Sequence, residues 1–295
     1  MNRRTFIGTS IAASLIGTRP MWAAEGKHQI DRVGLQLYTV RDAMKQDFEG
    51  TLAKVSAAGY REVEFAGYFD HSPKEIRATL ERHNLTAPSQ HVGYDVVEKK
   101  WPETLETAHV VGHQYIVCPW IDEAQRKQPD GWKRAAELFN RAGEASQKAG
   151  IQFAYHNHAF EFIPAESLGG KTGYDFLLAE TDAKLVKMEL DLCWATVGGQ
   201  DPVSFFERYP GRFPLVHVKD WKKEGAADGK YDKEAGRAGV PGHMADVGQG
   251  SIDWKRILGQ SEKAGIKHYF VENDNPEEAF ASIRTSYEYL AKLRF

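Results

Sequence analysis

Residues 185–219 read LVKMELDLCWATVGGQDPVSFFERYPGRFPLVHVK and contain the strand-helix-strand unit on which the fold prediction rests. The segment opens with one apolar run, Leu185–Trp194, and closes with another, Leu215–Lys219, and both have the length of strands. Between them Asp201 is followed by Pro202, an N-cap and first-turn proline of the kind that begins many helices. The pattern predicts two parallel strands joined by a crossover helix.

The same alternation extends in both directions along the chain. Segments of helical periodicity separate the apolar runs, and in residues 130–150, for example, apolar side chains recur at steps of three and four. That helix is predicted to end at Gly150, because glycine accepts the left-handed conformation that ends helices. The strand-like runs are Val33–Val40, Glu62–Gly67, Thr86–Val92, Tyr115–Trp120, Ile151–His158, Leu185–Trp194, Leu215–Lys219 and His268–Glu272. No glycine-rich dinucleotide fingerprint follows the first run. We therefore predict an α/β fold, a (β/α)8 TIM barrel that forms a single domain over residues 26–295.

Residues 1–25 have the pattern of an export signal. Arg3 and Arg4 precede an uncharged apolar stretch, Ile7–Gly17, as in signals of the twin-arginine type. We expect the protein to be exported to the periplasm by this route, with the segment either removed or retained as a membrane anchor. No later run approaches the roughly 20 apolar residues that span a bilayer.

The composition limits the partners of the chain. Its 38 basic and 41 acidic side chains give a formal charge of -3, which offers no broad positive surface to a nucleic-acid backbone. No nucleic-acid partner is expected, and homo-oligomer formation stays open. Cys118 and Cys193 each lie in an apolar run, and separate barrel strands would hold them too far apart to bond, so no disulfide is expected.

The interval between Asp220 and Ile252 does not follow the alternation of strands and helices seen in the rest of the chain. It is longer than ordinary strand-to-helix loops and rich in glycine. Because it follows a strand, it belongs to the C-terminal face, where barrels of this type carry their active sites. We predict a lid over that face, with a mobile decoration as the alternative.

Polar side chains occupy strand positions that should face the barrel interior. Side chains two positions apart share a face, so Glu189 pairs with Asp191 and His217 with Lys219. Such groups need an explanation, because barrel interiors normally carry branched apolar residues. The inward-facing set is His156, His158, Glu189, Asp191, His217, Lys219 and Glu272. Mixed carboxylates and imidazoles suit one divalent metal ion, Mn, Mg, Co or Zn, whereas a buried salt-bridge network is the alternative.

Five short motifs carry a resemblance to a known family. They are YHNHAFEF at 155–162, ELD at 189–191, VHVKD at 216–220, GQGSIDW at 248–254 and VE at 271–272. In this order they resemble the sugar phosphate isomerase/epimerase family, which has a xylose isomerase-like TIM barrel. The first strand, GLQLYTVR at 34–41, also fits, and the likeness covers the chain from Val33 to its end.

The resemblance implies a metal ion held at the ends of strands five to eight. Three residues match the family pattern directly: Asp191, His217 and Glu272. In the fifth strand many relatives carry a glutamate, where this chain offers His156, His158 or Glu161. We expect His158 to be the fourth ligand, with His156 and Glu161 as alternatives.

The hypothesis for function is an isomerase or epimerase that moves protons on a sugar or polyol through an enediolate. Three residues form the expected catalytic group: Glu189, Lys219 and Glu64. Glu189 is the expected base, with Glu272 as the alternative, and Lys219 would stabilise negative charge on oxygen. Four residues are expected to contact the substrate: His91, His156, Trp120 and Trp194.

Other functions stay open at this stage. The same chemistry could eliminate water or an alcohol, as in a dehydratase or lyase of the inosose or 3-keto-glycoside type, and export favours this alternative because phosphorylated sugars are scarce outside the cytoplasm. A non-catalytic periplasmic sugar-binding protein would need aromatic and hydroxyl partners but no metal. A phosphodiester endonuclease would need more metal ligands and a basic surface, which the charge balance disfavours.

Overall fold

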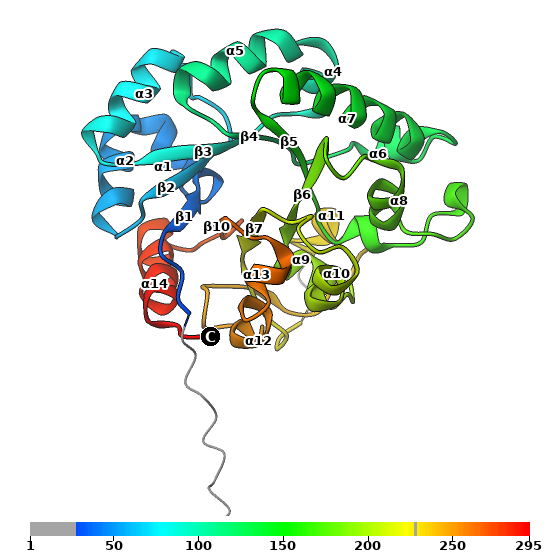
Figure 1. The fold of residues 1–295 in the computed structure, drawn as a ribbon. Helices are drawn as coiled ribbons and strands as arrows, with labels where there is room; N and C mark the ends of the chain where they lie inside the picture. The colour runs from blue at the N-terminus through cyan, green and yellow to red at the C-terminus, as the bar shows by residue number, and fades with distance from the viewer. Residues whose placement is uncertain (1–27, 227–228) are drawn as a thin grey trace, which may run out of the picture.

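The computed structural model describes residues 28–226 and 229–295. Within these residues eight parallel strands close into a barrel in the order β1-β10-β7-β6-β5-β4-β3-β2 (Figure 1). The barrel strands are β1 Val33–Gln36, β2 Glu62–Phe65, β3 Thr86–His91, β4 Tyr115–Cys118, β5 Gln152–His156, β6 Val186–Asp191, β7 Leu215–Val218 and β10 His268–Val271. β1 closes the barrel by pairing with both β2 and β10. The predicted (β/α)8 TIM barrel is confirmed, whereas the predicted export signal, residues 1–25, lies outside the described residues.

Helices cover the outside of the barrel (Figure 1). They are α1 Arg41–Gln46, α2 Phe48–Ala57, α3 Pro73–Arg82, α4 Tyr94–Lys99, α5 Trp101–Val111, α6 Glu123–Arg126, α7 Gly131–Lys148, α8 Gly173–Glu180, α9 Leu192–Val197, α10 Pro202–Arg208, α12 Trp254–Leu258, α13 Ser261–Ala264 and α14 Ala279–Lys292. In α7 the buried side chains include Trp132, Ala135, Leu138 and Phe139, and this spacing forms one apolar face against the sheet. No helix in the described ranges is long and apolar enough to cross a membrane.

All eight barrel strands are shorter than the apolar runs that predicted them, and the sixth shows the reason. The run Leu185–Trp194 was expected to be strand throughout, but β6 ends at Asp191 and α9 begins at Leu192. The reason is a cap: Asp191 Oδ1 accepts a hydrogen bond from Trp194 N at 2.7 Å, which starts a helix where the hydrophobicity continues. Cys193 is therefore helical rather than in a strand, and it is buried and free, as is Cys118.

The interval after β7 is a built structure over most of its length. β8 Asp220–Lys222 and β9 His243–Ala245 form an antiparallel pair, and the short helix α11, Asp232–Ala235, lies between them in sequence. The Asp220 carboxylate fixes the segment that follows β9. It accepts hydrogen bonds from Gly248 N at 2.9 Å and from Trp254 Nε1 at 3.0 Å. The interval that was predicted to form a lid, with a mobile decoration as the alternative, thus contains a hairpin with its own hydrogen bonds.

The barrel interior is apolar only in its middle. Five inward-facing side chains form that layer: Tyr115, Val117, Ala154, Leu215 and Phe270. Gly34 of β1 makes room for Phe270, since a Cβ at Gly34 would lie 2.5 Å from the Phe270 ring. At the N-terminal end of the strands Glu62 pairs with His268 at 2.8 Å. At the C-terminal end the strands turn a much larger polar group inward, and this group forms the candidate site.

Candidate active site

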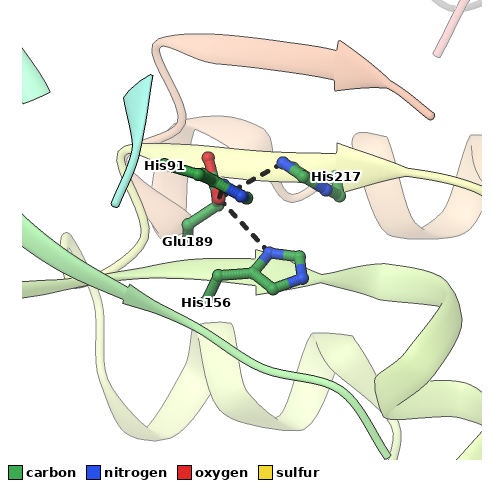
Figure 2. A group of neighbouring side chains, drawn as sticks. All are labelled: His91, His156, Glu189 and His217. Atoms are coloured by element: carbon green, nitrogen blue, oxygen red, sulfur yellow. Dashed lines mark hydrogen bonds and ion pairs between the residues drawn. The ribbon is translucent and has the colours of Figure 1, made fainter. Parts of the chain in front are cut away.

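Glu189 lies inside the barrel among three imidazoles (Figure 2). Its Oε2 is 2.7 Å from His91 Nε2, 3.2 Å from His156 Nδ1 and 3.2 Å from His217 Nε2. The four side chains come from β6, β3, β5 and β7, because alternate residues of each barrel strand face inward. We call these four residues the imidazole cluster.

Glu64 of β2 is held beside the imidazole cluster. Its carboxylate accepts hydrogen bonds from Gln36 Nε2 at 2.7 Å, Ser89 Oγ at 2.5 Å and His217 Nε2 at 2.7 Å. Burial alone would raise the pKa of Glu64, but the positive charge of His91 and the hydrogen bond from His217 hold it well below the usual range. Glu64 is therefore an ionised carboxylate with its hydrogen-bonding capacity occupied.

The ionisation of the three imidazoles follows from burial and from neighbouring charges. Burial would lower the pKa of His91, but the Glu64 and Glu189 carboxylates raise it to about 9. Burial would also lower the pKa of His217, and again adjacent carboxylates, Glu189 first among them, raise it well above its ordinary value. For His156, burial and the nearby His217 lower the pKa well below its ordinary value. His156 is thus the neutral imidazole of the cluster.

A second group of ionisable side chains lies further toward the C-terminal ends of the strands. His217 Nδ1 is 2.7 Å from Glu272 Oε2. Lys219 Nζ is 3.2 Å from Asp191 Oδ2, 2.8 Å from Glu272 Oε2 and 2.9 Å from Asp274 Oδ1. Burial would lower the pKa of Lys219, but these three carboxylates raise it well above its ordinary value. The structure thus brings Asp191, His217 and Glu272 together, with an ammonium group beside them.

The side chains of this region are arranged so that they could hold a divalent ion. Two sets of ligand atoms converge, each within 4.8 Å: the imidazole cluster, and the set Asp191, His217 and Glu272. In the second set, Asp191 Oδ2 is buried and accepts no hydrogen bond, although Lys219 Nζ is 3.2 Å away. This oxygen therefore has an ion-pair partner but no hydrogen bond among the described residues, so it could bind a divalent cation directly. Two carboxylates and an imidazole are ligands that Mn, Mg, Co and Zn accept, so the set fits such an ion.

Three fifth-strand residues were candidates for a fourth ligand, and they lie at different distances from this set. His156 Nε2 is 3.9 Å from Asp191 Oδ2. His158 follows the end of β5 and belongs to neither set of converging ligand atoms. Glu161 accepts hydrogen bonds from Tyr155 Oη at 2.6 Å and from the His158 backbone N–H at 2.9 Å. Glu161 therefore fixes the turn after β5, and His156 is the fifth-strand imidazole beside Asp191.

The His158 ring faces a pocket rather than the two ligand sets. It lies edge-on to Trp120, with ring centres 4.8 Å apart, and parallel to Phe160 at 5.8 Å. Burial and the charge of Lys219 lower the pKa of His158 well below its ordinary value, and its buried Nδ1 has no hydrogen-bond partner within residues 28–226 and 229–295. His158 is thus a neutral imidazole with a free nitrogen.

The pocket has a volume of about 490 Å³ and opens at the C-terminal ends of the strands. Six of its lining residues were candidates from the sequence: His91, Trp120, His156, His158, Lys219 and Glu272. Glu64 and Glu189 do not line it, because both are fully buried beneath the imidazoles. Trp194, expected to contact substrate, does not line the pocket: its buried indole lies behind His158, with ring centres 6.3 Å apart, and packs against Trp221 and Tyr231.

Several lining residues were not anticipated: Tyr38, Lys233, Glu234, Asp274 and Asn275. Asp274 follows Glu272 by two positions, so the alternation of the strand could have identified it. Burial raises the pKa of Asp274 to about 6 against the opposing charge of Lys219. Lys233 and Glu234 belong to α11, inside the interval that was predicted to lie over this face, but nothing in the sequence pointed to these two side chains.

Known proteins resemble the chain over most of its length. An inosose dehydratase of Lacticaseibacillus casei is 24% identical over 268 residues, which cover 84% of this chain and 87% of that protein. A crystal structure named as a sugar phosphate isomerase/epimerase of Parabacteroides distasonis ATCC 8503 superposes with a TM-score of 0.71 at 27% identity, covering 88% of this chain and 94% of that one. The structure of the IOLI protein with a zinc atom has the same fold, with a TM-score of 0.65 at 15% identity and coverage of 87% and 95%.

The family comparison agrees with the closed parallel barrel. The model of one family, described as xylose isomerase-like TIM barrel, matches residues 52–293. This chain belongs to the xylose isomerase-like TIM barrel family.

Proposed function

We propose that this chain is a metal-dependent dehydratase of a keto-sugar or keto-cyclitol, which removes a proton beside the carbonyl and then releases water. The observation that carries the proposal is the neutral His158 beside Lys219 and Glu272 in one pocket, next to a set of residues that fits a divalent ion. The extended similarity to an inosose dehydratase supports elimination as the outcome.

Asp191, His217 and Glu272 would hold the divalent ion, with His156 as the nearest fifth-strand imidazole. When bound, Mn, Mg, Co or Zn would act as a Lewis acid on the carbonyl group of the substrate. Asp191 Oδ2, which accepts no hydrogen bond, supports this assignment.

His158 is the proton acceptor in this proposal. Its Nδ1 has no hydrogen-bond partner, its ring lines the pocket and its lowered pKa keeps it in the basic form. The nearby Glu272 carboxylate favours the imidazolium that forms when the proton arrives. Glu189, the base expected from the sequence, does not reach the pocket, and we assign it to holding the imidazole cluster.

In this proposal Lys219 and Asp274 interact with the oxygen atoms of the substrate. Lys219 lines the pocket, and its raised pKa keeps it charged, so that it stabilises negative charge on an oxygen. Asp274 Oδ2 is buried without a hydrogen-bond partner, and with a pKa of about 6 this carboxyl can deliver a proton to a departing hydroxyl.

The test is a product analysis. The full chain, supplied with Mn or Mg, is incubated with keto-cyclitols and keto-sugars in deuterated water, and the products are examined by mass spectrometry. We expect a product that has lost the mass of one water. Retention of the full mass with deuterium incorporated beside the carbonyl would instead support isomerisation or epimerisation, the second candidate, which the similarity to the Parabacteroides distasonis structure favours.

Export to the periplasm is part of the proposal. The motif Arg3-Arg4 before an apolar stretch supports the twin-arginine route. Replacing both arginines by lysine should retain the protein in the cytoplasm, as measured by cell fractionation. Unchanged export of the double variant would reject this route.

A further inference from the structure

The pocket has an inner and an outer level. A series of aromatic rings connects them: ring centres are 4.3 Å apart between His217 and His156, 5.0 Å between His156 and His158, and 4.8 Å between His158 and Trp120. The inner residues take part in the proposed chemistry. Trp120 marks the outer level, and it is half-buried at the end of β4.

α11 supplies the polar side chains of the outer level, Lys233 and Glu234. The helix is attached to the barrel, because the Glu234 carbonyl accepts a hydrogen bond from Ala159 N at 3.0 Å. Gly236 ends α11 with a φ of 68° and packs so closely on Phe160 that a Cβ would lie 2.4 Å from the Phe160 Cβ. The two side chains are thus held at the pocket by backbone contacts.

The outer level contains groups that the proposed chemistry does not use. Glu234 Oε2 is a buried atom without a hydrogen-bond partner in the described part of the chain. Lys233 Nζ lies 4.9 Å from the centre of the Trp120 ring, and the Lys233 side chain is exposed. A buried acceptor without a donor costs free energy unless a ligand supplies one. An aromatic ring, an acceptor and a mobile donor together form a site of the kind that fixes a hydroxylated ligand.

We propose that Trp120, Lys233 and Glu234 form an outer subsite that binds a neutral, hydroxyl-rich substituent of the substrate, such as a second sugar ring. Glu234 accepts hydrogen bonds from its hydroxyl groups, Lys233 donates to them, and Trp120 packs against its apolar face. The inference rests on the proposed sugar-like substrate, and it makes the substrate larger than a single ring.

Size and charge both favour such a ligand. The volume of about 490 Å³ lies within the range of roughly 300–1,000 Å³ that is typical of pockets for drug-sized ligands, so it has room for a substituent beyond the reacting ring. A phosphate is disfavoured because Glu234, Glu272 and Asp274 all line the pocket. One ammonium, that of Lys219, faces three carboxylates, so the balance of charge at the inner end of the pocket is negative and opposes a phosphate.

Binding measurements on the full chain test the outer subsite without requiring turnover. Glucose is compared with trehalose, maltose, cellobiose and sucrose by isothermal titration calorimetry. We expect at least one disaccharide to bind about tenfold or more tightly than glucose. Glu234→Ala and Trp120→Ala should each abolish this gain and leave glucose binding within about twofold. Glu234→Gln, which keeps an acceptor oxygen, should retain most of it.

Glu137→Ala is the matched control, since Glu137 is an exposed carboxylate on α7 away from the pocket, and it should change neither ligand's binding. Disaccharides that bind no more tightly than glucose would overturn the proposal. An equal loss of glucose binding in the Glu234 and Trp120 variants would also overturn it.

Failure of the subsite is distinguishable from failure of the proposed function. A Glu234-dependent preference for a disaccharide, in a protein that dehydrates no keto-sugar, supports the subsite and rejects the dehydratase. Dehydration of a keto-cyclitol by a protein without any disaccharide preference rejects the subsite and supports the dehydratase.

Discussion

His217 belongs to both groups of ionisable residues in the site. Its Nε2 is 2.7 Å from Glu64 Oε2, and its Nδ1 is 2.7 Å from Glu272 Oε2. A cation bound by Asp191, His217 and Glu272 would therefore alter the charge balance of the imidazole cluster through one ring. A hydrogen-bond partner on the other nitrogen of a metal-ligating histidine orients the ring and tunes its basicity. Gln36 and Ser89, which hold Glu64, are part of that support.

The assignment of His158 predicts a specific kinetic defect. His158→Asn should lower kcat by roughly a hundredfold or more, because a positioned base contributes about 10²–10⁴-fold. Its metal content, measured by inductively coupled plasma mass spectrometry, should stay the same, since His158 lies outside both ligand sets. His156→Asn is the comparison and should lose metal. Loss of metal from the His158 variant alone would instead identify His158 as the ligand.

Lys219 predicts a link between stability and metal binding. Lys219→Met removes the ammonium that lies within 3.2 Å of three carboxylates. Breaking such a buried pairing costs roughly 3–5 kcal/mol, so the variant should melt at a lower temperature in the presence of a chelator. A divalent ion should replace the missing charge, bind roughly tenfold more tightly than to the wild type and restore much of the stability.

Calorimetric titration with Mn or Zn and thermal unfolding with and without chelator measure both effects. Lys233→Met is the matched control, because Lys233 is exposed and carries no carboxylate partner among the ion pairs found in the described residues. An unchanged metal affinity in Lys219→Met would mean that the ammonium does not oppose metal binding.

At the scale of elements, short polar side chains decide where strands become helices. β1 ends at Gln36, whose side chain accepts a hydrogen bond from Tyr38 N at 3.1 Å and starts a 3-10 helix, Leu37–Val40. β6 ends in the same way at Asp191, with Trp194 N as the donor. Hydrophobicity continues through both changes, so the apolar runs overestimate the strands. Both capping residues also contact the site, which couples the ends of the strands to its geometry.

The close contact between α11 and Phe160 predicts that alanine substitutions at Gly236 and Gly239 have different effects. Gly236→Ala should displace α11, because φ is 68° and the new Cβ would meet Phe160. Gly239→Ala has a comparable φ of 76° but no atom within 4 Å of the new Cβ. Both substitutions place a Cβ on a left-handed backbone, which costs roughly 1–2 kcal/mol of stability. Only Gly236→Ala should also speed hydrogen exchange in residues 159–163 and raise KM severalfold. Equal effects of the two substitutions would show that packing on Phe160 does not hold the helix.

At the scale of the whole molecule, His113 should make stability depend on pH. The ring is buried, with Nδ1 2.6 Å from Ala87 O and Nε2 2.8 Å from Tyr68 Oη. Burial lowers its pKa from 6.5 to about 4. Between these values the unfolded chain binds more protons than the folded one, so stability is present above pH 6.5 and is lost as the pH falls toward 4. The loss is roughly 3 kcal/mol at about 1.4 kcal/mol per pKa unit.

Urea unfolding between pH 4 and pH 7 measures this dependence. His113→Asn, which keeps a donor for Ala87 O and cannot titrate, should flatten the curve in this window. His109→Asn is the control, because His109 is exposed on α5 and should leave the curve unchanged. A slope that persists in the His113 variant would assign the effect to other groups.

The sequence by itself determined the barrel and the inward face of each strand. Both follow from local alternation: a strand turns every second side chain inward, so Glu189, Asp191, His217, Lys219 and Glu272 could be assigned before any distance was known. The caps at Gln36 and Asp191 were missed, because apolar runs hide a single hydrogen bond.

Only the tertiary structure decided which of these side chains meet. It put His156 beside Asp191, buried Trp194 behind the residues that line the pocket, and surrounded Lys219 with three carboxylates. It also brought Glu234 of α11 to the pocket from a segment far along the chain. These outcomes depend on distances between segments, which are set by closure of the barrel and the path of the insertion and leave no periodic trace in the sequence.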